Sequence, residues 1–124
     1  MKNKILYIAF AIILFTSCSK DSVILNPVDI FVQIPDVNFE KELVLKGIDS
    51  DGIVNQKILK TDAEKVTKLS LHGANINTLD GIEGFVNLKR LYADANNLTV
   101  LDLSNNVLLD TISLTSNRLI KVDG

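Results

Sequence analysis

The sequence is poor in the residues that usually mark redox, metal or aromatic chemistry. Its 124 residues include one Cys, one His, one Met, two Pro and no Trp. A lone cysteine, Cys18, excludes an internal disulfide. The formal net charge is −2, from 13 basic and 15 acidic residues scattered along the chain, so the sequence offers no basic surface for nucleic acid. Abundant Leu, Ile, Val and Asn instead favour one domain with a regular aliphatic core.

The start of the chain has the pattern of an export signal. Lys2 and Lys4 provide positive charge, and residues 5–15 form an apolar run of eleven residues. A transmembrane helix needs about 20 apolar residues, so this run is too short for a stable span. Small residues and then Cys18 follow. The pattern predicts a signal peptide over 1–17; the alternatives are an ordinary secretory signal with a chance cysteine and an uncleaved anchor helix.

Residues before Cys18 resemble the lipobox of bacterial lipoproteins, with Phe15 where Leu is usual. The resemblance implies acylation of the Cys18 thiol and cleavage of the chain just before it. Two or three acyl chains such as palmitate would then anchor the protein, because each buried CH₂ group contributes about 0.8 kcal/mol to membrane binding. Residues 19–21 (Ser-Lys-Asp) resemble the start of Bacteroidetes-type surface lipoproteins. We therefore expect an exported chain, lipid-anchored to the outer membrane and surface-exposed, with a tether over 18–27.

Residues 28–65 are predicted to form an N-terminal cap. Apolar residues alternate over 28–34, which predicts a half-buried strand. Residues 37–46 have apolar side chains four apart, and Gly47 can end a helix in the left-handed conformation. We therefore expect a strand and then a short helix, and we interpret residues 61–64 (Thr-Asp-Ala-Glu) as a capping box for one more helical turn.

The Asp-rich segment after this helix has two interpretations. If Gly52 occupied the sixth position of an EF-hand loop, Asp49 and Asp51 would be calcium ligands. Gly47 and Ile58 would then stand at the first and twelfth ligand positions, and neither has a side-chain oxygen to bind calcium. We interpret the segment as a turn built on Asp and Gly, keep Asp49 and Asp51 as a weak calcium candidate, and expect no bound metal and no cofactor.

From residue 66 to the end, the chain repeats the pattern LxxLxLxxNxL about three times. The copies begin at Val66, Leu88 and Leu109, so the spacing is 22 and then 21 residues. Apolar residues recur every third position over 76–85, which predicts a 3₁₀-like back wall. Repeated Asn, Gly and β-branched residues disfavour a plain amphipathic helix. We expect inward asparagines to bond the turns, and this proposed ladder comprises Asn75 (displaced by one position), Asn96, Asn106 and Asn117.

This pattern is identified as the leucine-rich repeat. The expected fold is an α/β solenoid, a right-handed leucine-rich-repeat coil with short parallel strands and a small helical N-terminal cap. Residues 34–124 resemble the short internalin-like leucine-rich-repeat lipoproteins of Bacteroidetes-type bacteria. The resemblance implies a cap, here over 28–65, and a solenoid, here over 66–124, that is used for binding at the cell surface or outside the cell, without catalysis. Our first hypothesis is a surface lipoprotein whose solenoid binds a protein or glycan.

The outward residues of the expected strands form a candidate binding face. Tyr92, flanked by Arg90 and Asp94, is the favoured hot spot, because Tyr and Arg dominate binding energies at interfaces. A merely solvated polar face is the alternative. His72 has no second His, Cys or paired carboxylate beside it in sequence, so we expect no enzyme activity. The candidates are Lys68, Ser70, His72, Arg90, Tyr92, Asp94, Thr111, Ser113 and Thr115.

Two further features of the sequence bear on the hypothesis of a binding solenoid. Residues 119–124 begin another half-repeat and stop without a polar cap. The alternative to a binding role is therefore a structural module that self-associates through this end or belongs to a longer repeat protein. Short motifs around Ser22 and Thr111 resemble the O-glycosylation motif of the same bacteria.

Overall fold

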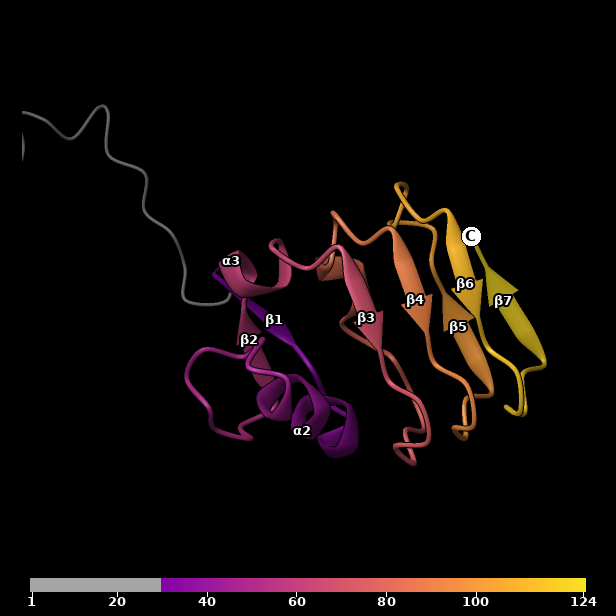
Figure 1. Ribbon diagram of the computed structural model, residues 1–124, viewed down its shortest axis with the longest axis horizontal. Helices are drawn as coiled ribbons and strands as arrows, with labels where there is room; N and C mark the ends of the chain where they lie inside the picture. The colour runs from indigo at the N-terminus through magenta and orange to yellow at the C-terminus, as the bar shows by residue number, and fades with distance from the viewer. Residues whose placement is uncertain (1–29) are drawn as a thin grey trace, which may run out of the picture.

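The computed structural model describes residues 30–124, in which a cap is followed by a row of stacked repeats (Figure 1). The expectations for the signal peptide, the tether, Cys18 and Ser22 lie outside the described residues. Within residues 30–124, no helix is long and apolar enough to cross a membrane.

The cap consists of two short strands and two helices. The strands pair in antiparallel fashion, with Val32 opposite Ile58. Gly47 ends the first helix in the left-handed conformation, at φ +69°, and its N–H donates to the Val44 carbonyl. The helix ends one residue before the predicted boundary. The elements are β1 (Phe31–Gln33), α2 (Val37–Leu45), β2 (Lys57–Leu59) and α3 (Lys60–Ala63).

The predicted capping box is wrong, although a helical turn does form. The residue that precedes α3 is Leu59, and no side chain caps the helix. An N-cap residue must lie before the first turn in extended conformation, whereas Thr61 already lies inside α3 because the chain becomes helical directly after β2. Asp62 instead accepts a hydrogen bond from the Ser50 N–H at 3.0 Å and ties the Asp-rich turn to α3.

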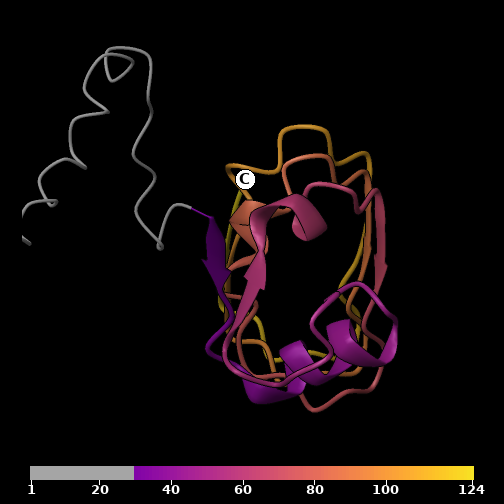
Figure 2. The same cartoon turned by 90° about the vertical axis from the view of Figure 1, so that its left-hand side faces the viewer.

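The repeats place short parallel strands on two walls. On one wall β3, β4 and β6 form a three-stranded parallel sheet, and β5 pairs with β7 on the other. The view along the row shows the two walls with turns between them (Figure 2). A repeat solenoid with short parallel strands is thus confirmed. Its elements are β3 (Lys68–Ser70), η3 (Ile82–Gly84), β4 (Arg90–Tyr92), β5 (Val100–Asp102), β6 (Thr111–Ser113) and β7 (Lys121–Asp123).

The back wall differs between the repeats. In the first repeat it holds the 3₁₀ turn η3, as the every-third-residue pattern predicts. Residues 78–80, just before η3, form no strand, whereas the equivalent residues of the next repeats form β5 and β7. Strand β1 packs closely on η3, since a Cβ added to Gly84 would lie 2.4 Å from a Val32 methyl group. Gly81 has φ +102°, and a Cβ added there would lie just as close to the Gln33 carbonyl oxygen. Two glycines therefore allow the cap strand to approach the first repeat.

The core runs without interruption from the cap into the repeats. Leu69 of β3 and Leu91 of β4 are fully buried between the walls. The rings of Phe39 in α2 and Phe85 after η3 lie 6.1 Å apart, centroid to centroid, and join the two parts. In β6, by contrast, Ile112 is 47% exposed. Because one repeat cannot bury its own apolar side, the stacking of the cap and the repeats on one another stabilises the fold.

Asparagine side chains, buried at Asn96 and half-buried at Asn117, bond the backbone groups of the turns. The Oδ1 atom of Asn96 accepts hydrogen bonds from the N–H groups of Ala74 and Ile76, both at 3.0 Å, and its Nδ2 donates to the Leu71 carbonyl at 2.7 Å. Asn117 bonds in the same way one repeat later, accepting from the Leu98 N–H at 3.0 Å. Each of these side chains thus joins its own turn to the preceding repeat.

Asn75 does not belong to this ladder. The structure aligns Ala74, not Asn75, with Asn96, and Asn75 has φ +58° with an exposed side chain. A one-residue displacement turns the side chain away from the interior, which explains the difference from our expectation. Asn106 is buried at the opposite turn, where its Nδ2 donates to the carbonyls of Ile82 and Phe85.

A cap residue, Asp36, connects the cap to the first repeat. Its Oδ1 caps α2 by accepting from the N–H groups of Asn38 and Phe39. Its Oδ2 accepts from the N–H groups of Asn77 and Thr78 at 2.7 and 3.1 Å. One nearly buried carboxylate therefore bonds both the first turn of the helix and the turn of the first repeat.

A second buried carboxylate, Glu40, organises the cap loop. The Glu40 side chain is fully buried, although it lies on the short helix α2. It accepts hydrogen bonds from three consecutive backbone N–H groups, those of Asn55, Gln56 and Lys57, at 2.7–3.1 Å. These bonds hold the loop before β2 against α2.

We predict that Asp36→Asn weakens the junction between the cap and the first repeat. Asn is as good an N-cap as Asp, so α2 keeps its cap, but an NH₂ group would face the N–H groups of Asn77 and Thr78. We expect the free energy of unfolding to fall by about 2–3 kcal/mol, measured by urea unfolding. Asp80→Asn, on an exposed residue, is the matched control; an equal loss in both variants would contradict the role of Asp36.

Candidate binding face

The sheet β3-β4-β6 brings most of the predicted binding residues together in two rows. The strand register aligns Lys68 with Arg90 and Thr111. It also aligns Ser70 with Tyr92 and Ser113, and these form the second row. Successive residues of a strand point to opposite sides of the sheet, and Leu69 and Leu91 point into the core. The two rows therefore share the outer side of the sheet.

A third row follows the ends of the strands. The Gly73 N–H donates to the Asp94 carbonyl, which places His72 beside Asp94. The Asp94 carboxylate accepts hydrogen bonds from the Ser113 hydroxyl and from the Thr115 hydroxyl and N–H. These donors lower the pKa of Asp94 below its usual value. The acidic residue of the face is thus held by its neighbours on the next repeat.

Tyr92 lies at the centre of the two rows and is half-buried. The Lys68 ammonium lies 5.6 Å from the centroid of its ring, a cation–π distance. Lys68 and Arg90 are both exposed, and neither takes part in the ion pairs found within residues 30–124. The face therefore presents an aromatic ring beside two cations.

A hollow of about 450 Å³ lies between the cap and β3, next to this face. Ile48 and Val66 give it apolar walls, and its charged lining consists of Lys65, Lys68 and the Asp62 carboxylate. The Lys65 ammonium bonds the Asp62 carboxylate at 3.2 Å. Sequence reasoning missed this hollow because its sides come from two parts of the chain that only folding brings together.

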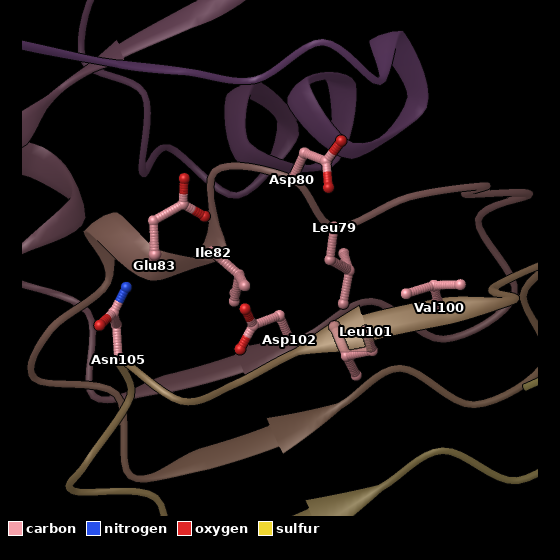
Figure 3. A pocket seen from close by; sticks show the side chains of 8 residues that line it. All are labelled: Leu79, Asp80, Ile82, Glu83, Val100, Leu101, Asp102 and Asn105. Carbon is pink, nitrogen blue, oxygen red and sulfur yellow. The ribbon is translucent and has the colours of Figure 1, made fainter. Parts of the chain in front are cut away.

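A second hollow, of about 310 Å³, lies on the opposite wall (Figure 3). Figure 3 shows the carboxylates of Asp80, Glu83 and Asp102 around it, from the segment at η3 and from β5. Asp80 and Asp102 lie 22 residues apart, the spacing of the first two repeats, which is the one sequence signal for this site. Within residues 30–124, no group of three His, Cys, Asp or Glu side chains is arranged to hold a metal ion.

The Asp-rich segment is a turn, and its two carboxylates have different surroundings. Asp51 accepts hydrogen bonds from the Ile53 N–H at 2.7 Å and from the Asn55 amide at 3.0 Å, so it serves the turn itself. Asp49 is buried, and its Oδ2 has no hydrogen-bond partner within residues 30–124. Burial raises the pKa of Asp49 to about 6, and the negative charge of Asp51 acts in the same direction.

No protein-family model and no curated protein matches the sequence. Solved structures of internalins from Listeria monocytogenes, however, share its fold. The functional domain of InlJ is 29% identical, with a TM-score of 0.62, over 72% of this chain and 20% of that chain. An internalin (inlF) is 23% identical, with a TM-score of 0.58, over 72% and 29%. Internalin C2 is 24% identical, with a TM-score of 0.57, over 69% and 38%.

The fold thus belongs to the leucine-rich-repeat class, and within that class it is internalin-like. The chain spans between 20% and 38% of the length of these three solved chains. The InlJ domain is described as including a cysteine ladder. The present chain has one cysteine, Cys18, and the side chains of Asn96 and Asn117 connect its successive repeats.

We predict that the buried Asp49 makes the fold more stable at mildly acidic pH. Because the folded pKa of about 6 exceeds the ordinary value of 3.8, the folded state binds the proton more tightly, and stability falls as the pH rises through this window. The loss amounts to about 2 kcal/mol between pH 4 and pH 7, measurable by urea unfolding. Asp49→Asn should remove this pH dependence of the free energy of unfolding, and Asp80→Asn should keep it. An equal pH dependence in the parent protein and both variants would contradict the role of Asp49.

Proposed function

We propose that the protein is a lipid-anchored leucine-rich-repeat lipoprotein of the bacterial cell surface, which binds a protein or glycan through the outer side of the sheet β3-β4-β6. The observation that carries this proposal is the alignment of polar side chains from three strands on one surface around Tyr92. The internalin-like fold supports a binding module, because the repeats build an extended sheet and not an enclosed cleft.

The chemistry of this face favours a binding role over a merely solvated surface. Tyr92 presents a half-buried ring with a polar tip, and Arg90 lies beside it on β4. Tyr and Arg are the side chains that most often dominate binding energies. Asp94 is already fixed by Ser113 and Thr115, so this part of the face loses little side-chain freedom when a partner binds.

The membrane anchor rests on the N-terminal pattern. Two lysines, a short apolar run and small residues precede Cys18, and the Ser-Lys-Asp segment follows it. Acyl chains on Cys18 would attach the repeats to the outer membrane through the tether over 18–27. Such an anchor would hold the binding face close to the membrane while leaving it accessible.

We predict that a palmitate analogue labels the protein in growing bacteria and that Cys18→Ser abolishes the label. A hydroxyl group does not replace the thiolate as acceptor, so the variant should also keep its signal peptide. In-gel fluorescence and intact-mass analysis measure the two effects. Ser19→Ala is the control and should be labelled like the parent protein. A label that persists in Cys18→Ser would contradict the anchor.

We predict that a photo-crosslinking residue at position 70 captures the partner on intact cells and that one at position 99 does not. Ser70 and Thr99 are both exposed, but Ser70 lies on β3 and Thr99 directly precedes β5 on the other wall. The readout is the yield of crosslinked adducts by gel and mass spectrometry. Equal yields at the two positions, or adducts at position 99 alone, would place the binding surface elsewhere.

A further inference from the structure

Two cations lie side by side at the start of the binding face. Lys68 and Arg90 occupy aligned positions on the neighbouring strands β3 and β4, and both are exposed. Like charges directly opposite each other on a sheet are destabilising. The chain is acidic overall, with a net charge of −2. Lys68 lies over the Tyr92 ring, and the two aligned cations leave positive charge exposed at this edge of the sheet.

The described residues leave this positive charge without a carboxylate partner. The ion pairs within residues 30–124 join Lys46 to Glu42, Lys65 to Asp62 and Lys121 to Asp123, and they leave out Lys68 and Arg90. Two carboxylates lie at this face and accept hydrogen bonds from its hydroxyl groups. Asp94, beyond the other end of β4, accepts from Ser113 and Thr115. Asp110, directly before β6, accepts from the Thr111 hydroxyl at 2.7 Å and forms no ion pair with Lys68 or Arg90. An anionic partner would therefore supply the missing charge.

The neighbouring hollow adds an apolar requirement. Lys68 lines both the face and the hollow of about 450 Å³, whose walls include Ile48 and Val66. A ligand that reaches Lys68 and Arg90 can therefore place an apolar group between the cap and β3. The combination suits a peptide with an apolar side chain next to carboxylates better than a sulfated glycan, which carries little apolar surface.

We infer that this surface, which we call the basic corner (Lys68, Arg90 and the adjoining hollow), binds an acidic segment of a partner protein. Carboxylates of the segment pair with Lys68 and Arg90, where the Arg90 guanidinium can bind one of them through two hydrogen bonds. An aliphatic side chain of the segment enters the hollow between Ile48 and Val66. The inference rests on the proposed function, since it names the chemistry of the partner at that face.

The test uses the full chain and a short fluorescein-labelled peptide in which glutamates flank one leucine. Anisotropy should show binding that weakens as salt is added, because exposed charges are screened. Lys68→Gln with Arg90→Gln should weaken binding about tenfold. Lys41→Gln with Arg118→Gln removes the same charge from exposed positions on α2 and after β6, and it should leave binding unchanged.

Three further probes make the result specific. Replacing the peptide leucine by serine should weaken binding, because the hollow then loses its apolar group. Lys68→Glu with Arg90→Glu should instead bind the matching lysine peptide, a gain that misfolding cannot produce. A heparin oligosaccharide should bind more weakly than the glutamate peptide.

The inference is overturned if the control pair weakens binding as much as Lys68→Gln with Arg90→Gln, since charge alone would then explain the effect. It is also overturned if heparin binds and the glutamate peptide does not, which would favour a sulfated glycan. Failure of the peptide while crosslinks at position 70 persist would reject the acidic segment and leave the proposed function intact. Loss of those crosslinks would instead reject the proposed function.

Discussion

Each turn between the walls of this solenoid exposes backbone N–H and carbonyl groups to the interior, and the structure depends on the polar side chains that bond them. Asn96 and Asn117 do this for successive repeats, each reaching back into the repeat before it. Asp36 does it for the first repeat and caps α2 at the same time. An unsatisfied buried backbone group costs about 1–3 kcal/mol, so these few side chains decide whether the aliphatic walls can stack at all.

The same bonds determine the geometry of the binding face. Because each repeat is attached to its predecessor through the turn, β3, β4 and β6 pair in one parallel register. That register aligns Lys68 with Arg90 and Ser70 with Tyr92. A one-residue slip would reverse the side chains and place leucines on the surface. The turn bonds and the strand pairing together therefore position the side chains of the face.

Much of this organisation could be predicted from local pattern. The helix expected over 37–46 is α2 (Val37–Leu45), and Gly47 ends it as expected. The 3₁₀ turn of the back wall also follows from the spacing of apolar residues. The misassigned Asn75 and the absent capping box show the limit of such patterns. Both errors concern the exact position of a polar residue. Asn75 lies one residue beyond the ladder position, and Thr61 lies two residues after Leu59, the N-cap of α3.

The sequence by itself determined the periodic core, the alternation of inward leucines and outward polar residues, and the order of cap and repeats, since each of these is a local spacing rule. The tertiary structure alone decided what the buried carboxylates do. Asp36 bonds residues about forty positions away, and Glu40 holds a loop some fifteen positions away. It also brought the cap against β3 to form the hollow beside Lys68. Contacts between segments so far apart depend on how the repeats stack, and no local spacing encodes them.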